Sequence, residues 1–355
     1  MKKTLFYYTQ LRDDRSRMLY RNILQSIREG KNEALAKNVH FSLDDVTKVY
    51  HAIQYDYPEL FFVDFFGDGC YLTWQKNGDI KVEFRYIFNP EIQKAKRKEN
   101  ENFIQYIISH IPDNVCPSQY LTALWLHDLL VSNMRYDHAG REKKLREIYT
   151  VEGGISSKKA VCAGVARLYM MLCERLDIWC TYIVGDTHLD EEDKKTNAEG
   201  SSGRHAWNLL RLDGEYAYTD VTWDLQNDDS SGYISHTYFG MCDEQCSRTR
   251  KREYYFEGIQ YPICSGPGYL NYYVREHCFF SNIKEVLSHI QKETTARKGH
   301  TEFMINPCGE AYEKLLEFIP QWISNYLHQA AGVRKWSWIK DHKMLVFHYR
   351  FEYVD

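Results

Sequence analysis

Residues 204–224, RHAWNLLRLDGEYAYTDVTWD, constrain the fold more than any other stretch of the chain. Two runs of alternating apolar and polar residues flank Asp213-Gly214, which is a strong signal for a two-residue β-hairpin loop. With this loop, Leu212 faces Glu215, and every other pair of facing residues follows from that pair. The sequence therefore predicts two antiparallel strands in a fixed register.

The predicted register brings a histidine and an aspartate onto one face of this hairpin. His205 faces Thr222, and because side chains alternate along a strand, His205 and Asp220 are diagonal neighbours on the same face. Diagonal backbone positions lie about 7–8 Å apart, a gap that these side chains can bridge by a hydrogen bond. Asp224 is diagonal to His205 on the other side, so parity does not choose between the two carboxylates. The alternative is a purely structural hydrogen bond.

A second informative stretch, SSKKAVCAGVARLYMMLCERLDIWC, occupies residues 156–180. Apolar side chains recur at helical spacing after Cys162, at Val165, Leu168, Tyr169, Leu172 and Leu176. The pattern predicts a buried helix that begins at or next to Cys162. The positive end of a helix dipole favours the thiolate, the reactive form of cysteine. The alternative is that Cys162 is a small buried apolar residue, a common role for a free cysteine.

Cysteine, histidine and aspartate together fit one kind of chemistry. An imidazole held by a carboxylate takes or shares the proton of a thiol, and the carboxylate fixes the tautomer and orientation of the ring. Backbone N–H groups in the first turn of a helix can bind an oxyanion. We therefore interpret Cys162, His205 and one of the two aspartates as candidates for a thiol-dependent active site.

Three motifs, in this order, resemble the transglutaminase-like superfamily: Val161-Cys162-Ala163-Gly164, His205-Ala206-Trp207-Asn208 and Asp220-Val221-Thr222-Trp223-Asp224. The resemblance covers residues 118–225. It implies an α+β fold with a papain-like core, in which a nucleophile-bearing helix packs on an antiparallel sheet. It also implies that Cys162 is the nucleophile, His205 the base and Asp220, rather than Asp224, the acid.

The same resemblance suggests which residues surround the reacting groups. In the family the oxyanion is held by the N–H of the nucleophile and by a polar side chain from an upstream segment, for which Tyr136 is our candidate. The alternative is that Tyr136 is an aromatic residue packed at a helix end. Trp207 and Trp223 are candidates for the wall of the pocket or for the core. The polar loop from residue 185 to 203 leads into His205, and we expect either a plain surface loop or a lid over the site.

The resemblance leaves two flanking regions, and we predict an α+β segment at each end. We divide the chain into an N-terminal segment at 1–115, a transglutaminase-like core at 116–270 and a C-terminal segment at 271–355. Helices are expected over 13–29, from an N-cap at Ser42, over 90–111 and over 120–134, with a hairpin around Asn77-Gly78. The C-terminal segment is expected to contain a helix at 283–291, a strand at 302–305, a helix at 310–327 and two strands around Lys340-Asp341.

Charge and hydropathy exclude several classes of partner. A formal net charge of -4 over 355 residues gives no reason to expect nucleic acid, and the basic runs at 94–98 and 248–252 are interpreted as solvated faces. The apolar stretch after the N-terminal lysines ends at Tyr8, which is too short for a signal peptide. No window reaches the length needed to span a membrane, so we expect a soluble, cytoplasmic protein with no membrane partner.

Free thiols are the expected state of the 10 cysteines, because a chain of this length does not need disulfides to hold its core. The group Cys242, Cys246, His277 and Cys278 contains no Cys-x-x-Cys pair, so we predict no metal site and no cofactor.

These observations predict a thiol-dependent acyl-transfer enzyme that acts on an amide bond of a peptide or protein substrate through a Cys162 thioester. Water would complete a protease or amidase reaction, and an amine would complete a cross-linking transglutaminase reaction. The alternative function is a non-catalytic binding or scaffolding protein on a transglutaminase-like core. Retention of all three residues favours the enzyme. The sequence leaves the substrate and the oligomeric state open.

Overall fold

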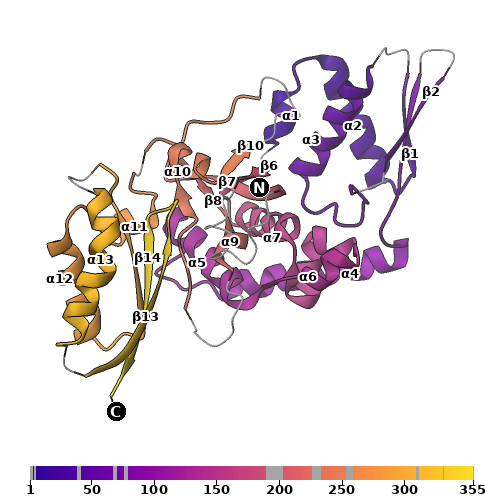
Figure 1. Cartoon of the computed structure of the whole chain (residues 1–355). Coiled ribbons are helices and arrows are strands. Elements are labelled where there is room, and N and C mark those ends of the chain that lie inside the picture. The colour runs from indigo at the N-terminus through magenta and orange to yellow at the C-terminus, as the bar shows by residue number, and fades with distance from the viewer. Residues whose placement is uncertain are drawn as a thin grey trace.

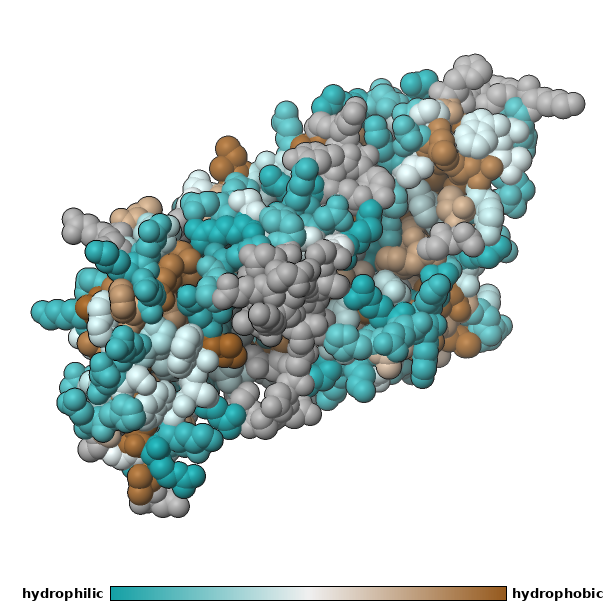
Figure 2. All heavy atoms as spheres, in the orientation of Figure 1, coloured by the Kyte–Doolittle hydropathy of each residue, from teal (hydrophilic) through white to brown (hydrophobic). Residues whose placement is uncertain are grey.

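The computed structural model shows an α+β protein with three sheets of three or more strands, arranged along the length of the molecule among the described residues (Figure 1). N-terminal elements lie at one end, the central sheet in the middle and the C-terminal elements at the other end. The structure describes residues 3, 5–37, 41–66, 70–75, 79–188, 203–225, 233–252, 259–266, 268–308, 312–330 and 332–354. On the face seen in Figure 2, hydrophilic side chains cover most of the coloured surface and hydrophobic ones form scattered patches.

The N-terminal part combines helices with a small antiparallel sheet of order β1-β3-β2. Its elements are α1 (Phe6–Gln10), α2 (Asp14–Arg28), β1 (Glu33–Ala36), α3 (Leu43–Asp56), β2 (Cys70–Trp74), β3 (Ile80–Phe84) and α4 (Pro90–Ser109). The predicted helix starts are confirmed, because Asp13 caps α2 and Ser42 forms a capping box with Asp45 at α3. The strands of the predicted hairpin pair as expected, whereas its Asn77-Gly78 turn lies outside the described residues.

The central part contains a five-stranded antiparallel sheet of order β10-β6-β7-β8-β9. Before the sheet come α5 (Gln119–Asn133), β4 (Arg135–Tyr136), α6 (His138–Glu142), η1 (Glu147–Tyr149), η2 (Gly153–Ser157), β5 (Lys159–Ala160) and α7 (Cys162–Arg175). The sheet and its connections are β6 (Trp179–Thr187), β7 (Gly203–Leu212), β8 (Glu215–Thr219), α9 (Val221–Asp224), β9 (Phe239–Met241), α10 (Asp243–Ser247) and β10 (Arg250–Arg252). Helix α7 packs on β6 and β7, as the resemblance implied.

Close backbone packing fixes the start of α7. A Cβ atom at Gly164 would lie 2.3 Å from the carbonyl oxygen of Ile148 and 2.8 Å from that of Thr150, so only glycine allows this approach. Farther along the helix, the side-chain amide of Asn208 on β7 donates a hydrogen bond of 2.9 Å to the carbonyl of Ala166. The first turn of α7 is therefore held between the η1 segment and the sheet.

The register of the β7–β8 hairpin is confirmed, but its second strand is shorter than predicted. Leu212 faces Glu215 and Asn208 faces Thr219, as expected. The expectation that His205 faces Thr222 is wrong, because Asp220 accepts a hydrogen bond from the Trp223 N–H and starts α9 there.

The C-terminal part consists of two long helices and a four-stranded sheet of order β11-β12-β14-β13. Its elements are α11 (Tyr272–Arg275), β11 (Phe279–Phe280), α12 (Ile283–Thr295), β12 (His300–Ile305), α13 (Tyr312–Leu327), β13 (Val333–Asp341) and β14 (Val346–Tyr353). Each predicted helix and strand is present, and the final turn follows Asp341 instead of including it. Residues 309–311, at the predicted start of α13, lie outside the described residues.

Two clusters of buried hydrophobic side chains form the core and meet at the central sheet. One cluster joins the N-terminal helices and α7, including Leu168, to the face of the sheet that carries Leu210. The other joins Trp207 and Leu209, from the opposite face, to Phe303 of the C-terminal sheet. Strand β7 thus alternates between two cores, which holds its residues in place on both sides. Within the described part of the chain, no helix is both long and apolar enough to cross a membrane.

Candidate active site

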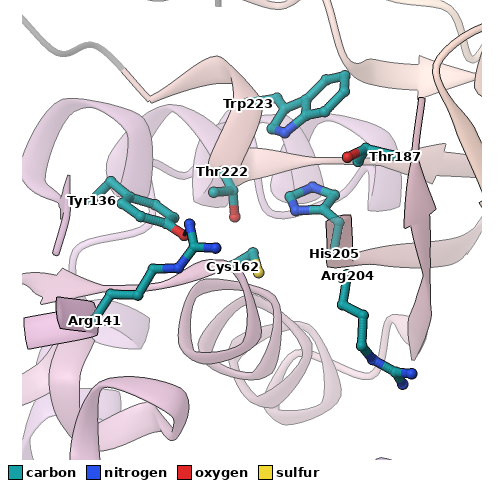
Figure 3. A pocket seen from close by; sticks show the side chains of 8 residues that line it. All are labelled: Tyr136, Arg141, Cys162, Thr187, Arg204, His205, Thr222 and Trp223. Carbon is teal, nitrogen blue, oxygen red and sulfur yellow. Dashed lines mark hydrogen bonds between the residues drawn. The ribbon is translucent and has the colours of Figure 1, made fainter. Parts of the chain in front are cut away.

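A cavity opens at the N-terminus of α7, where Cys162 is the first helical residue (Figure 3). The residues that line it are Tyr136, Arg141, Cys162, Thr187, Arg204, His205, Thr222 and Trp223. Figure 3 shows the sulfur of Cys162 beside the imidazole of His205. Cys162 is partly exposed, so the cavity gives an approaching substrate access to its thiol.

His205 is held between the thiol and a carboxylate. Its Nε2 lies 2.6 Å from Oδ2 of Asp220, and its other ring nitrogen is left to hydrogen-bond with Cys162. The ring lies between two indoles, with ring centroids 6.0 Å from Trp207 and 5.3 Å from Trp223. The imidazole is buried, and this packing restricts its rotation.

Opposing effects determine the pKa of the Cys162 thiol. Burial disfavours the thiolate, but attraction to His205, a hydrogen bond from His205 and a backbone hydrogen bond from Ala206 together lower the pKa below its ordinary value. The position at the start of α7 acts in the same direction, because the helix dipole favours negative charge there. The geometry thus favours a thiolate opposite an imidazolium.

The pKa values of His205 and Asp220 are shifted in opposite directions. Burial alone would lower the pKa of His205, but Asp220 and Cys162 raise it to about 9. Burial alone would raise the pKa of Asp220, but His205 and Arg250 lower it to about 2. Both shifts favour an ionised Asp220 beside a protonated His205.

Sequence reasoning missed one charged residue at this site, Arg250. The run at 248–252 was expected to be a solvated face, but Arg250 is 3% exposed, so that expectation is wrong for this residue. Its Nε and Nη2 lie 3.0 and 2.6 Å from Oδ2 of Asp220, the same oxygen that contacts His205. Its guanidinium also lies 3.8 Å from the ring centroid of Trp223. No local sequence pattern predicts that Arg250 is buried, because its partner Asp220 lies 30 positions earlier in the chain.

The second aspartate considered in the sequence lies elsewhere. Asp224, at the end of α9, has its Oδ2 3.1 Å from Nε2 of His127, and its Oδ1 accepts from the hydroxyl of Ser235. The structure therefore brings Asp220, and not Asp224, against His205. The one-turn helix α9 explains the difference, because Asp220 caps its N-terminus and Asp224 is its last residue, so the two carboxylates meet different neighbours.

Of the remaining candidate residues, Tyr136 and Trp223 line the cavity and Trp207 does not. Tyr136 lies across the cavity from His205, and its hydroxyl accepts a weak hydrogen bond of 3.4 Å from Arg141 (Figure 3). Trp223 lines the cavity, whereas Trp207 is fully buried and stacks on His205 from behind. Thr222, between the two aspartates in sequence, also faces the cavity. The central part of the suggested lid, residues 189–202, lies outside the described residues.

The thiolate and imidazolium pair predicts an unusual pH profile for alkylation of Cys162. The pKa of the Cys162 thiol is lowered by the neighbouring imidazolium, which the pKa of His205, about 9, keeps protonated below that pH. We expect iodoacetamide to alkylate Cys162 faster than exposed Cys116 at neutral pH. This advantage of Cys162 should shrink as the pH rises through about 9 and His205 loses its proton. Peptide mapping after timed labelling measures both rates in one sample.

A His205→Gln variant provides the control for this profile. Without the imidazolium, burial is left as the largest effect on the pKa of the thiol, so the advantage of Cys162 at neutral pH should disappear and its labelling should require higher pH. A wild-type Cys162 that reacts no faster than Cys116 near neutral pH would rule out the activated thiol.

Part of the chain is similar to known proteins. Residues 111–222, which contain Cys162, His205 and Asp220, match the transglutaminase-like superfamily. A proposed cysteine protease from Cytophaga hutchinsonii shares 13% identity over 43% of this chain and 61% of that protein, with a TM-score of 0.25. A structure described as a TGase shares 13% identity over 45% of each chain, with a TM-score of 0.22. The chain thus spans less than two thirds of either protein, and no curated protein matches it.

Proposed function

Taking residues 111–222 as a segment of the transglutaminase-like superfamily, we propose that this chain is a thiol-dependent acyl-transfer enzyme that acts on amide bonds of a peptide or protein. The observation that carries the proposal is the contact chain Cys162–His205–Asp220 at a helix N-terminus that opens to a cavity. Nucleophilic catalysis by cysteine needs a thiolate, a group that returns a proton and a group that orients it. In this arrangement Cys162 provides the thiolate, His205 returns the proton and Asp220 orients His205.

In the first half of the reaction, the Cys162 thiolate attacks the amide carbonyl carbon. A C–S bond forms and the carbonyl electron pair moves onto oxygen. We assign the oxyanion to the backbone N–H of Cys162 and to the hydroxyl of Tyr136, which lines the cavity beside Arg141. When the oxyanion collapses, the C–N bond breaks and the leaving amine takes the proton of the His205 imidazolium.

In the second half, neutral His205 removes a proton from water or from an acceptor amine, which attacks the thioester carbonyl. The C–S bond then breaks and the thiolate is restored beside the imidazolium. Throughout, Asp220 keeps the ring oriented and stabilises its positive form, and Arg250 keeps Asp220 ionised. The residues of the cavity serve hydrolysis and amine transfer alike, so the acceptor is decided by which molecule reaches the thioester.

Trapping the thioester tests this function. The full chain is mixed with a pool of synthetic peptides that contain glutamine and asparagine side-chain amides, with or without a biotinylated primary amine, and quenched in acid. We expect a peptide-derived acyl mass on the Cys162 fragment, which hydroxylamine removes as a hydroxamate. Biotin transfer would identify a transglutaminase, and cleavage or deamidation would identify a hydrolase. A chain that gives neither acyl mass nor product would overturn the proposal in favour of a binding protein.

A further inference from the structure

A second group of ionisable side chains lies apart from the cavity, between α5 and the segment that leads into β9. His127 and Asp128 are neighbours on α5, and His236 comes from the segment before β9. Nδ1 of His127 lies 2.9 Å from Oδ1 of Asp128, and Nε2 of His236 lies 3.0 Å from the same oxygen. One atom from each residue falls within 4.8 Å of the others. Two imidazoles and one carboxylate therefore converge on one point.

The outward nitrogen of each imidazole is held by a further carboxylate. Nε2 of His127 lies 3.1 Å from Asp224, and Nδ1 of His236 lies 2.6 Å from Glu302. A histidine that binds a metal ion nearly always has its other ring nitrogen fixed by a carboxylate or carbonyl in this way, because the second contact sets the tautomer and aims the first nitrogen. The same arrangement occurs twice here, around one point.

The second carboxylates are themselves anchored. Asp224 accepts hydrogen bonds from the Ser235 hydroxyl and from the Tyr238 N–H. Glu302 accepts from the hydroxyls of Tyr233 and Tyr273, at 2.8 and 2.7 Å. These hydrogen bonds hold Asp224 and Glu302 in place, and the two carboxylates in turn orient the imidazoles of His127 and His236. The other nitrogen of each ring therefore points at Asp128.

Burial and access also suit an ion. The side chains of His127 and His236 are 0% and 9% exposed, which gives a low-dielectric pocket for the two nitrogen ligands. The Asp128 carboxylate is 31% exposed, so an ion can reach the site from solvent on this side. The aromatic ring of Tyr272 stacks on His236 with centroids 3.8 Å apart and closes another side.

We propose that Nδ1 of His127, Nε2 of His236 and the Asp128 carboxylate bind one divalent zinc ion, with Asp224 and Glu302 as outer partners. Two imidazole nitrogens disfavour Ca²⁺ and Mg²⁺, which take oxygen ligands, and two nitrogens with one carboxylate form a usual zinc donor set. Zn–N bonds are about 2.0–2.1 Å long, and the three ligand atoms lie within 4.8 Å of one another. Binding replaces the protons that now lie between the ring nitrogens and Asp128.

The position of this site suggests what the ion does. The three ligands belong to the central part, whereas Glu302 lies on β12 of the C-terminal sheet. Asp224 ends the same short helix that Asp220 begins. A bound zinc ion would therefore tie α5, α9 and the C-terminal sheet together, stabilising the junction beside the acid of the proposed acyl-transfer site.

Cobalt binding tests the proposal with a spectroscopic signature. The full chain is treated with chelator, dialysed and titrated with Co²⁺, and Zn²⁺ is then added to displace it. We expect one equivalent of Co²⁺ with visible d–d bands and without the intense near-ultraviolet bands of thiolate-to-cobalt charge transfer. This signature distinguishes the site from adventitious binding by the ten cysteines. Zinc should also raise the melting temperature of the wild-type chain.

Matched variants locate the ion. Asp128→Asn, which preserves side-chain volume, and His236→Gln should each weaken Co²⁺ binding by about 100-fold or more, and Glu302→Gln by about 10- to 100-fold. His289→Gln removes another partly buried histidine of the C-terminal part and should leave binding unchanged. Cys162→Ala should also leave it unchanged, which separates this proposal from the acyl-transfer function.

Three results would overturn the zinc site: no stoichiometric binding by the wild-type chain, thiolate charge-transfer bands in its spectrum, or unchanged affinity in Asp128→Asn. Near-ultraviolet circular dichroism identifies variants that have kept native packing, and affinities are compared among those.

Discussion

Replacing Cys162 by alanine is expected to abolish amide turnover, with a loss of about a thousandfold or more. The thiolate is the only group that forms the covalent bond in the proposed reaction, and its removal leaves His205 and Asp220 with nothing to activate except water. The decisive measurement is the initial rate of product formation from the peptide pool by equal amounts of wild-type and variant chain. Loss of the acyl-enzyme mass should accompany loss of turnover.

Cys173→Ala is the matched control for this variant. Cys173 lies on the same helix, is fully buried and does not line the cavity, so its removal deletes the same atom without touching the reacting groups. We expect wild-type turnover from Cys173→Ala, with a modest decrease in stability from the small cavity it leaves. Equal turnover by Cys162→Ala and wild type would exclude Cys162 as the nucleophile.

Asp220→Asn is expected to lower turnover by roughly 10³–10⁴-fold and to destabilise the fold by about 3–5 kcal/mol. Both carboxylate oxygens accept hydrogen bonds: Oδ2 from Arg250 and the imidazole of His205, and Oδ1 from the Trp223 N–H. An amide must turn its NH₂ group toward one of these donors, so no orientation satisfies the site. The buried guanidinium also loses its charge partner. Turnover rates and urea unfolding measure the two effects.

A double variant separates catalysis from stability. Adding Arg250→Gln to Asp220→Asn removes the uncompensated buried charge, so part of the lost stability should return while turnover stays low. Asp56→Asn is the control for loss of a buried hydrogen-bonded carboxylate, because Asp56 accepts from two backbone N–H groups and a tyrosine hydroxyl and does not line the cavity. It should lose stability and keep thiol reactivity. If Asp220→Asn kept full turnover, the orienting role of Asp220 would be disproved.

Local patterns were enough to predict much of this architecture. The start of α7 at Cys162 follows from apolar spacing, and the register of β7 and β8 follows from the two-residue turn. Helix starts at Asp13 and Ser42 follow from capping residues, whose effect extends over one turn. In each case the interaction that decides the structure is between residues close in sequence.

The features that the sequence missed or misjudged depend on contacts between distant segments. Asp220 leaves the hairpin because it caps α9 and its own N–H bonds to the carbonyl of Tyr238. Arg250 is buried because a carboxylate 30 positions earlier in the chain compensates its charge. His127 and His236 meet although no motif spans the residues between them. Tertiary packing determines the position of Asp220, the burial of Arg250 and the meeting of the two histidines. The spacing of apolar residues along the sequence carries no information about such packing.

The stacking of Trp223 gives the molecule a built-in optical reporter. One face of its indole lies 3.8 Å from the guanidinium of Arg250, and its ring centroid is 5.3 Å from that of the His205 imidazole. Indole fluorescence is sensitive to nearby positive charge, and an imidazolium quenches it where a neutral imidazole does not. The chain has eight tryptophans, and Trp207 also stacks on His205, so we expect this signal in the part of the emission that a Trp223→Phe variant loses. That part should change when His205 is protonated and when Cys162 is acylated.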